Sequence, residues 1–125
     1  MNTWTSSLLS DSRSIVDELL CEPLEDLEAL TSQVRSYREL VHSAARPMTD
    51  VDLADALSDA TLELLERTAK APRAVRRLVQ VAARYFVLQD DGDDDLTSPY
   101  GFDDDVEVFN AVVEALGEPH RALAY

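Results

Sequence analysis

The segment "PRAVRRLVQVAARYFVL", residues 72–88, is apolar on most of its circumference when it is drawn as a helix. Its apolar positions include Leu78, Val79, Val81, Ala82, Tyr85, Phe86 and Val87. Pro72 suits the first turn of a helix, because the N–H that proline lacks has no intrahelical partner there. A helix that is hydrophobic on nearly all sides packs in the centre of a bundle. The segment therefore predicts a central helix and an all-α fold.

The chain before this segment repeats its apolar residues at helical spacing, and strand-like alternation is rare. Ser10 and Asp11 are placed to cap a first helix. Pro23 suits an early position of a second helix, and Thr49 with Asp52 resembles the capping box of a third. The expected inward residues are Ile15, Val16, Leu19 and Leu20 in the first helix; Leu27, Leu30, Val34, Tyr37, Val41 and Ala44 in the second; and Leu53, Leu57, Ala60, Leu64 and Leu65 in the third.

A last helix is expected to begin near Asp103–Asp105, because carboxylates stabilise the positive end of a helix, and to stop at Gly117. Its expected inward residues are Val106, Phe109, Val112, Val113 and Leu116. Residues 1–9 read as a loosely docked arm and residues 118–125 as a short tail. We predict one domain over residues 1–125, a compact bundle of four or five helices with an acidic turn before the last helix.

That turn is the stretch "DDGDDDLTSPYGFDDD", residues 90–105, which places eight aspartates and no base in sixteen residues. Six of the eleven bases lie shortly before it, between residues 67 and 84. Four of them form one polar stripe on the central helix together with Gln80, namely Arg73, Arg76, Arg77 and Arg84. Guanidinium groups pair with carboxylates in two-pronged hydrogen bonds. We therefore expect a structural ion-pair network of Arg77, Arg84, Asp91, Asp95, Asp104 and Asp105.

The stretch that starts at Tyr85 resembles the YkvA-like domain, a small bacterial helical family of unknown function. The aspartates of that family's pattern fall on Asp91, Asp95, Asp104 and Asp105, and its glycine on Gly101. The two prolines of the pattern fall on Gln89 and Asp94, and its apolar residues after the first aspartate fall on Gly92 and Asp93. The resemblance implies a helical domain whose acidic turn joins the central helix to the last one. It implies no activity.

A cation site in the same turn is the first alternative, since clustered carboxylates suit calcium or magnesium. Asp91, Asp95 and Asp104 would be its ligands. An EF-hand loop is excluded, because placing Gly92 or Gly101 at its sixth position puts an apolar residue at the first ligand position. The structural network is the preferred interpretation, and no metal or other cofactor is expected.

The residues that could carry catalysis are few. Cys21 is the only cysteine, which excludes an internal disulfide and a multi-cysteine zinc site. His42 and His120 belong to no catalytic motif, and glycine-rich phosphate loops are absent. We expect no catalytic residue and a protein that is not an enzyme.

The net charge of −14 makes direct binding to nucleic acid or to an anionic membrane an unfavourable prospect. No apolar run approaches the length that spans a bilayer. We expect a cytoplasmic bacterial accessory protein, a monomer or a homodimer, that binds a protein partner, with a basic one favoured by the surplus acids. A nucleic-acid mimic or an immunity-type inhibitor of a basic protein is the alternative within this class.

Overall fold

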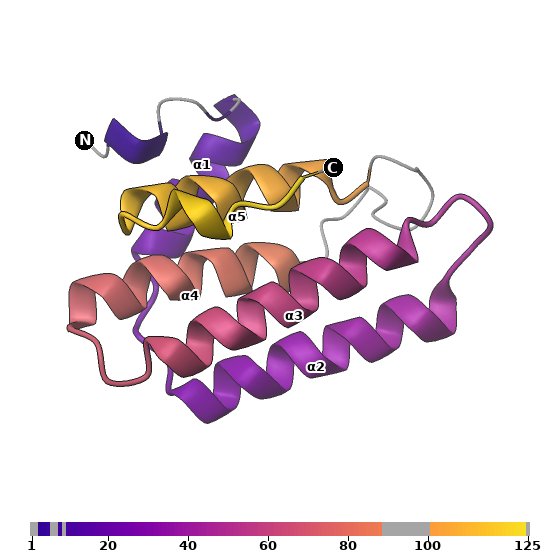
Figure 1. Cartoon of the computed structure of the whole chain (residues 1–125), viewed down its shortest axis with the longest axis horizontal. Coiled ribbons are helices and arrows are strands. Elements are labelled where there is room, and N and C mark those ends of the chain that lie inside the picture. Colours follow the sequence, from indigo (N-terminus) through magenta and orange to yellow (C-terminus); the bar gives the residue numbers. More distant parts are fainter. Residues whose placement is uncertain (1–2, 6–7, 9, 89–100, 125) are drawn as a thin grey trace.

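The computed structural model describes residues 3–5, 8, 10–88 and 101–124. Within them it contains five α-helices and no strand. The helices are α1 (Ser10–Leu20), α2 (Leu27–Ala44), α3 (Val51–Arg67), α4 (Arg73–Val87) and α5 (Asp103–Ala115), with short 3₁₀ helices at Thr3–Thr5 and Pro119–Arg121. The predicted all-α bundle is confirmed (Figure 1). No described helix is both long enough and apolar enough to cross a membrane.

Helix α4 lies at the centre of the bundle and packs against α1, α2, α3 and α5, as predicted (Figure 1). It contributes to two clusters of buried side chains. Val79 and Phe86 belong to the larger cluster, which joins α2, α3 and α5. Val81 and Tyr85 belong to the smaller one, with Leu8, α1 and α5. Apolar side chains on opposite sides of α4 are therefore buried, which explains why so much of its circumference is apolar.

Helices α2 and α3 run antiparallel beneath α4 (Figure 1). The middle of the predicted α2 seam is buried, and Tyr37 meets Phe86 of α4 edge to face, with ring centroids 5.1 Å apart. The ends of the seam are less covered: Leu27 is 39% exposed and Ala44 is half-buried.

The starts of α2 and α3 differ from the expected ones. Pro23 does not begin α2; the helix starts at Leu27, because the Asp26 side chain accepts a hydrogen bond from the Ala29 N–H at 2.8 Å. Likewise Asp50, and not Thr49, caps α3, accepting from the Leu53 N–H at 3.0 Å. In both places the aspartate directly before the helix, Asp26 or Asp50, provides the N-cap.

Helix α5 begins at Asp103 and is terminated at Gly117, as predicted. Gly117 adopts a φ of +80°, which favours glycine. The Glu118 N–H then bonds the Val113 carbonyl at 2.8 Å, in the pattern of a Schellman motif. The chain after it folds back along α5, where the Asn110 side chain bonds both the N–H and the carbonyl of Leu123. The end of the chain is therefore docked on α5 over most of its described length.

Candidate functional site

The two arginines of the predicted network have partners in the linker between α1 and α2. Arg77 donates from one Nη to the carbonyl oxygens of Leu20 and Glu22, at 3.1 and 2.7 Å. Arg84 donates from Nε to Glu22 Oε1 at 3.2 Å, and its Nε lies 3.6 Å from Glu25 Oε2. The polar stripe on α4 therefore holds the chain that leads from α1 into α2.

Sequence reasoning missed this role, and it missed Gln80 as its centre. The Gln80 side chain is 1% exposed; its Oε1 accepts from the Glu25 N–H at 2.7 Å and its Nε2 donates to the Pro23 carbonyl at 2.9 Å. A signal was present, because an amide within an apolar helix requires partners. Its partners lie 55 and 57 residues away, beyond what a local pattern can indicate.

The aspartates of the predicted network are only partly described. Asp91 and Asp95 lie outside the described residues, so their pairing with Arg77 and Arg84 stays a prediction. Asp104 is exposed in the first turn of α5, whereas Asp105 is 6% exposed. Among the described residues no group of three or more histidine, cysteine, aspartate or glutamate side chains is arranged to hold a metal ion. The predicted alternative cation site includes Asp91 and Asp95, and it therefore remains untested.

His42 belongs to an ion-pair cluster between α2 and α3. Its Nε2 lies 2.7 Å from Asp55 Oδ1, and Arg38 reaches the same oxygen from Nε at 3.1 Å. Arg38 also donates to Asp59 at 2.8 Å. Desolvation acts to raise the pKa of Asp55, but the hydrogen bond from His42 and the charge of Arg38 hold it below its usual value. These contacts fasten two helices together, which is a structural role.

Cys21 and His120, the other candidates for chemistry, are both exposed. Cys21 lies in the linker after α1, and His120 lies in the 3₁₀ helix near the end of the chain. These two positions belong to separate elements, and no hydrogen bond to either side chain is seen among the described residues. The arrangement offers no pairing of a nucleophile with a base.

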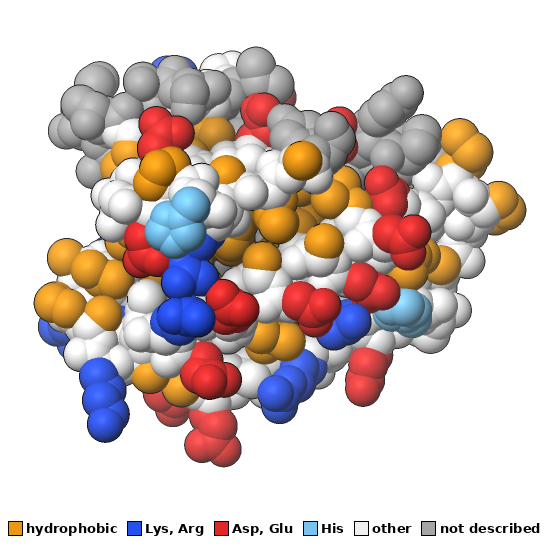
Figure 2. Space-filling view, viewed as in Figure 1, with side chains coloured by type: hydrophobic (Ala, Val, Ile, Leu, Met, Phe, Trp, Pro, Cys, Tyr) orange, Lys and Arg blue, Asp and Glu red, His pale blue; other side chains and the backbone are white. Residues whose placement is uncertain are grey.

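The surplus negative charge is segregated within the molecule. Residues 21–88, which include α2, α3 and α4, hold eleven acidic and nine basic residues. Residues 1–20 and 101–125 hold nine acidic and two basic residues, and residues 89–100 hold five aspartates and no base. Figure 2 shows acidic and basic side chains mixed over α2 and α3 on the face in view. Twelve of the fourteen excess charges thus belong to α1, α5 and the chain between α4 and α5.

Most bases are already engaged within the protein. Seven of the eleven contact a carboxylate or a backbone carbonyl, namely Arg13, Arg38, Arg67, Arg76, Arg77, Arg84 and Arg121. Arg121, for example, bonds Glu63 of α3 at 2.8 Å and also Glu118. Five of the nine bases in residues 21–88 therefore already have a partner within the protein.

We define the acidic side by the exposed carboxylates of α1 and α5, which are Asp11, Asp17, Glu18, Asp104, Glu107 and Glu114. The surface of α5 also carries two shallow grooves. One is lined by Trp4, Ala111 and Glu114, and the other by Leu8, Glu107 and Glu114. An aromatic and an aliphatic side chain thus lie among carboxylates. This combination of an apolar centre and a charged rim is common at protein interfaces.

At the start of α5, acidic side chains lie close enough to repel one another. Burial, helped by the nearby charges of Asp50 and Glu107, raises the pKa of Asp103 above its usual value. Asp103 and Glu107 are four residues apart on one helix, a spacing at which like charges destabilise. The chain thus concentrates negative charge at a cost to its own stability.

No family model, no curated protein and no solved structure matches this chain. The resemblance to the YkvA-like domain therefore rests on the residue pattern alone.

Proposed function

We propose that this chain is a non-catalytic interaction module whose acidic side binds a basic protein partner. The observation that carries the proposal is the charge segregation: twelve of the fourteen excess negative charges lie on α1, α5 and the chain before α5. Charges gathered on one side steer the approach of an oppositely charged partner and select against an acidic one.

The grooves on α5 also favour the acidic side as the binding surface. Trp4 is half-buried and packs against both core clusters, so it is held in place before a partner arrives. Tryptophan is frequent among the residues that dominate binding energy. A partner that places aliphatic or aromatic groups beside Trp4 and lysine or arginine opposite Glu107 and Glu114 would complement this surface.

The proposal is tested with two variants of equal charge. The first neutralises the acidic side with Asp17→Asn, Glu18→Gln, Glu107→Gln and Glu114→Gln. The second neutralises four exposed acids of α2 and α3 with Glu28→Gln, Glu39→Gln, Asp52→Asn and Glu66→Gln. Proteins captured from cell extract by the unmodified chain are identified, purified and titrated against all three chains.

We expect the acidic-side variant to bind the purified partner at least about tenfold more weakly, and the α2–α3 variant to bind it nearly as well as the unmodified chain. The affinity of the unmodified chain should also fall as salt rises. Equal losses in both variants would reject the acidic side as the binding surface. Competition by double-stranded DNA for the captured partner would favour the nucleic-acid mimic within this proposal.

A further inference from the structure

A second surface, at the corner between α3 and α4, has the opposite charge. Residues 67–77 contain five bases and no acid, although the whole chain carries a net charge of −14. Three of these bases have partners: Arg67 lies 3.4 Å from Glu63, Arg77 bonds carbonyls of the α1–α2 linker, and Arg76 bonds the Ala71 carbonyl through Nε alone. Lys70 and Arg73 are exposed, and the described residues provide no carboxylate within ion-pair distance of either. The corner is therefore a positive spot on an acidic molecule.

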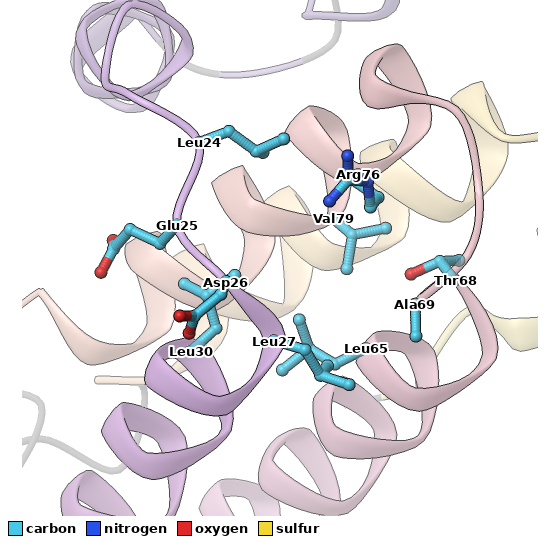
Figure 3. A pocket seen from close by; sticks show the side chains of 10 residues that line it. All are labelled: Leu24, Glu25, Asp26, Leu27, Leu30, Leu65, Thr68, Ala69, Arg76 and Val79. Atoms are coloured by element: carbon cyan, nitrogen blue, oxygen red, sulfur yellow. The ribbon is translucent and has the colours of Figure 1, made fainter.

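An apolar pocket opens beside this corner, between the start of α2, the end of α3 and the start of α4. Its volume is about 90 Å³. Figure 3 shows the side chains that form it, and the apolar ones are Leu24, Leu27, Leu30, Leu65, Ala69 and Val79. Leu27 is 39% exposed, so the pocket continues into an apolar rim.

Some polar groups of the pocket already have hydrogen-bond partners within the protein, and others do not. Asp26 caps α2 through the Ala29 N–H, and Glu25 bonds Gln33 at 2.7 Å. Arg76 donates from Nε to the Ala71 carbonyl at 3.2 Å, and its two amino groups have no hydrogen-bond partner among the described residues. In Figure 3 Arg76 and Thr68 lie across the pocket from the carboxylates of Glu25 and Asp26. The site therefore presents free donors beside an apolar cavity.

The size of the pocket limits what enters it. An apolar cavity of roughly 150 Å³ binds benzene, which has six carbon atoms. In proportion, about 90 Å³ holds three or four carbons, the branched end of a valine or leucine side chain. Pockets for whole small ligands are larger, about 300–1,000 Å³, and bury most of the ligand. A side chain that belongs to a longer chain fits the site better than a free metabolite.

We propose that this pocket binds the carboxyl-terminal residue of a partner polypeptide that ends in leucine or valine. The aliphatic side chain enters the cavity between Leu27, Leu65 and Val79. The terminal carboxylate accepts hydrogen bonds from the free amino groups of Arg76, and Lys70 and Arg73 attract it from the surface. The two partially charged prongs of guanidinium match a carboxylate in geometry. This site is independent of the acidic side.

The test is a titration of the ¹⁵N-labelled full chain, followed by NMR, with the N-acetylated tetrapeptide Gly-Ser-Gly-Leu. Three probes are compared: the free acid, the carboxyl-terminal amide, and the free acid with glycine in place of the final leucine. We expect shifts in residues 24–30 and 65–79, with the amide and the glycine peptide each at least about tenfold weaker.

Arg76→Gln should abolish the preference for the free acid over the amide, whereas Arg35→Gln, which removes the same charge from an exposed position of α2 outside the pocket, should keep it. Circular dichroism checks that both variants are folded. Equal binding of acid and amide, or shifts confined to residues outside these two ranges, would overturn the proposal. The acidic-side variant should bind the leucine peptide as well as the unmodified chain, so the two proposals fail separately.

Discussion

Gln80 interrupts the apolar surface of α4 between Val79 and Val81, and it is 1% exposed. Its amide satisfies one N–H and one carbonyl of the α1–α2 linker. A buried amide without these partners would destabilise the fold. The N–H and the carbonyl of the linker would do the same if the amide were removed. Gln80 therefore determines the path by which the chain passes from α1 to α2.

We predict that Gln80→Leu lowers the free energy of unfolding by about 2–3 kcal/mol, because it leaves the Glu25 N–H and the Pro23 carbonyl without their partner. Urea unfolding measures the change. The sign is decisive, since a leucine that merely added apolar burial would raise stability. A variant as stable as the unmodified chain would show that the linker does not depend on this amide.

Thr61 on α3 differs from Gln80 in the hydrogen bonding of its buried side chain. Its side chain is 1% exposed, and its hydroxyl has no hydrogen-bond partner among the described residues. Thr61→Val replaces the hydroxyl by a methyl group of similar size and should raise the free energy of unfolding by about 1 kcal/mol. Ser58→Ala is the matched comparison: the Ser58 hydroxyl donates to the Ala54 carbonyl at 2.8 Å, so this variant should gain nothing. Thermal unfolding of the two variants distinguishes these outcomes.

At the scale of elements, the pattern of apolar residues predicted which helices exist, because burial of one face leaves apolar residues at helical spacing. It also predicted that α4 is central, because α4 carries more apolar positions than a single buried face needs. The boundary at Pro23 was wrong, because a proline that suits a first turn also suits an extended linker. The row of arginines was recognised, but its partners were not. Arg77 and Arg84 reach a linker 55 to 62 residues earlier, and only the packing of α1 against α4 brings it there.

The ion-pair cluster between α2 and α3 predicts a pH dependence. The pKa of Asp55 is lower in the folded chain, so its stabilising contribution is complete above the unfolded value of about 3.9 and is lost as pH falls through the folded value. Asp55→Asn should cost about 0.5–1 kcal/mol at pH 7. The difference from the unmodified chain should shrink as the pH falls from 5 towards 3. A difference that is unchanged at pH 3 would contradict this assignment to Arg38 and His42.

Asp103 should show the opposite sign. Its pKa is higher in the folded chain, so its unfavourable effect is absent below the unfolded value and grows as pH rises through the folded one. Asp103→Asn should therefore raise the free energy of unfolding at pH 7 by about 0.5 kcal/mol, relieving the repulsion from Glu107 and Asp50. The gain should vanish near pH 3 in urea unfolding. Asp52→Asn, which removes an exposed charge from the first turn of α3, controls for net charge and should not stabilise.

At the scale of the whole molecule, the fold places a nearly neutral part, α2 to α4, against two strongly acidic helices. Several bases of the first part are held by ion pairs within it, as the contacts of Arg38 and Arg84 show. The net charges of α1 and α5 have the same sign, so these two helices repel each other. This repulsion opposes folding while it favours a basic partner.

Salt should consequently stabilise the free protein, because screening weakens repulsion between exposed charges more than ion pairs in contact. We predict that the melting temperature at pH 7 rises between 10 and 300 mM NaCl, by roughly 3–5 °C for each 1 kcal/mol of relieved repulsion. The variant with Asp17→Asn, Glu18→Gln, Glu107→Gln and Glu114→Gln should show a smaller rise than the equally charged α2–α3 variant. Equal slopes for the two would mean that only the net charge matters, and the segregation of acids on α1 and α5 would then have no energetic consequence.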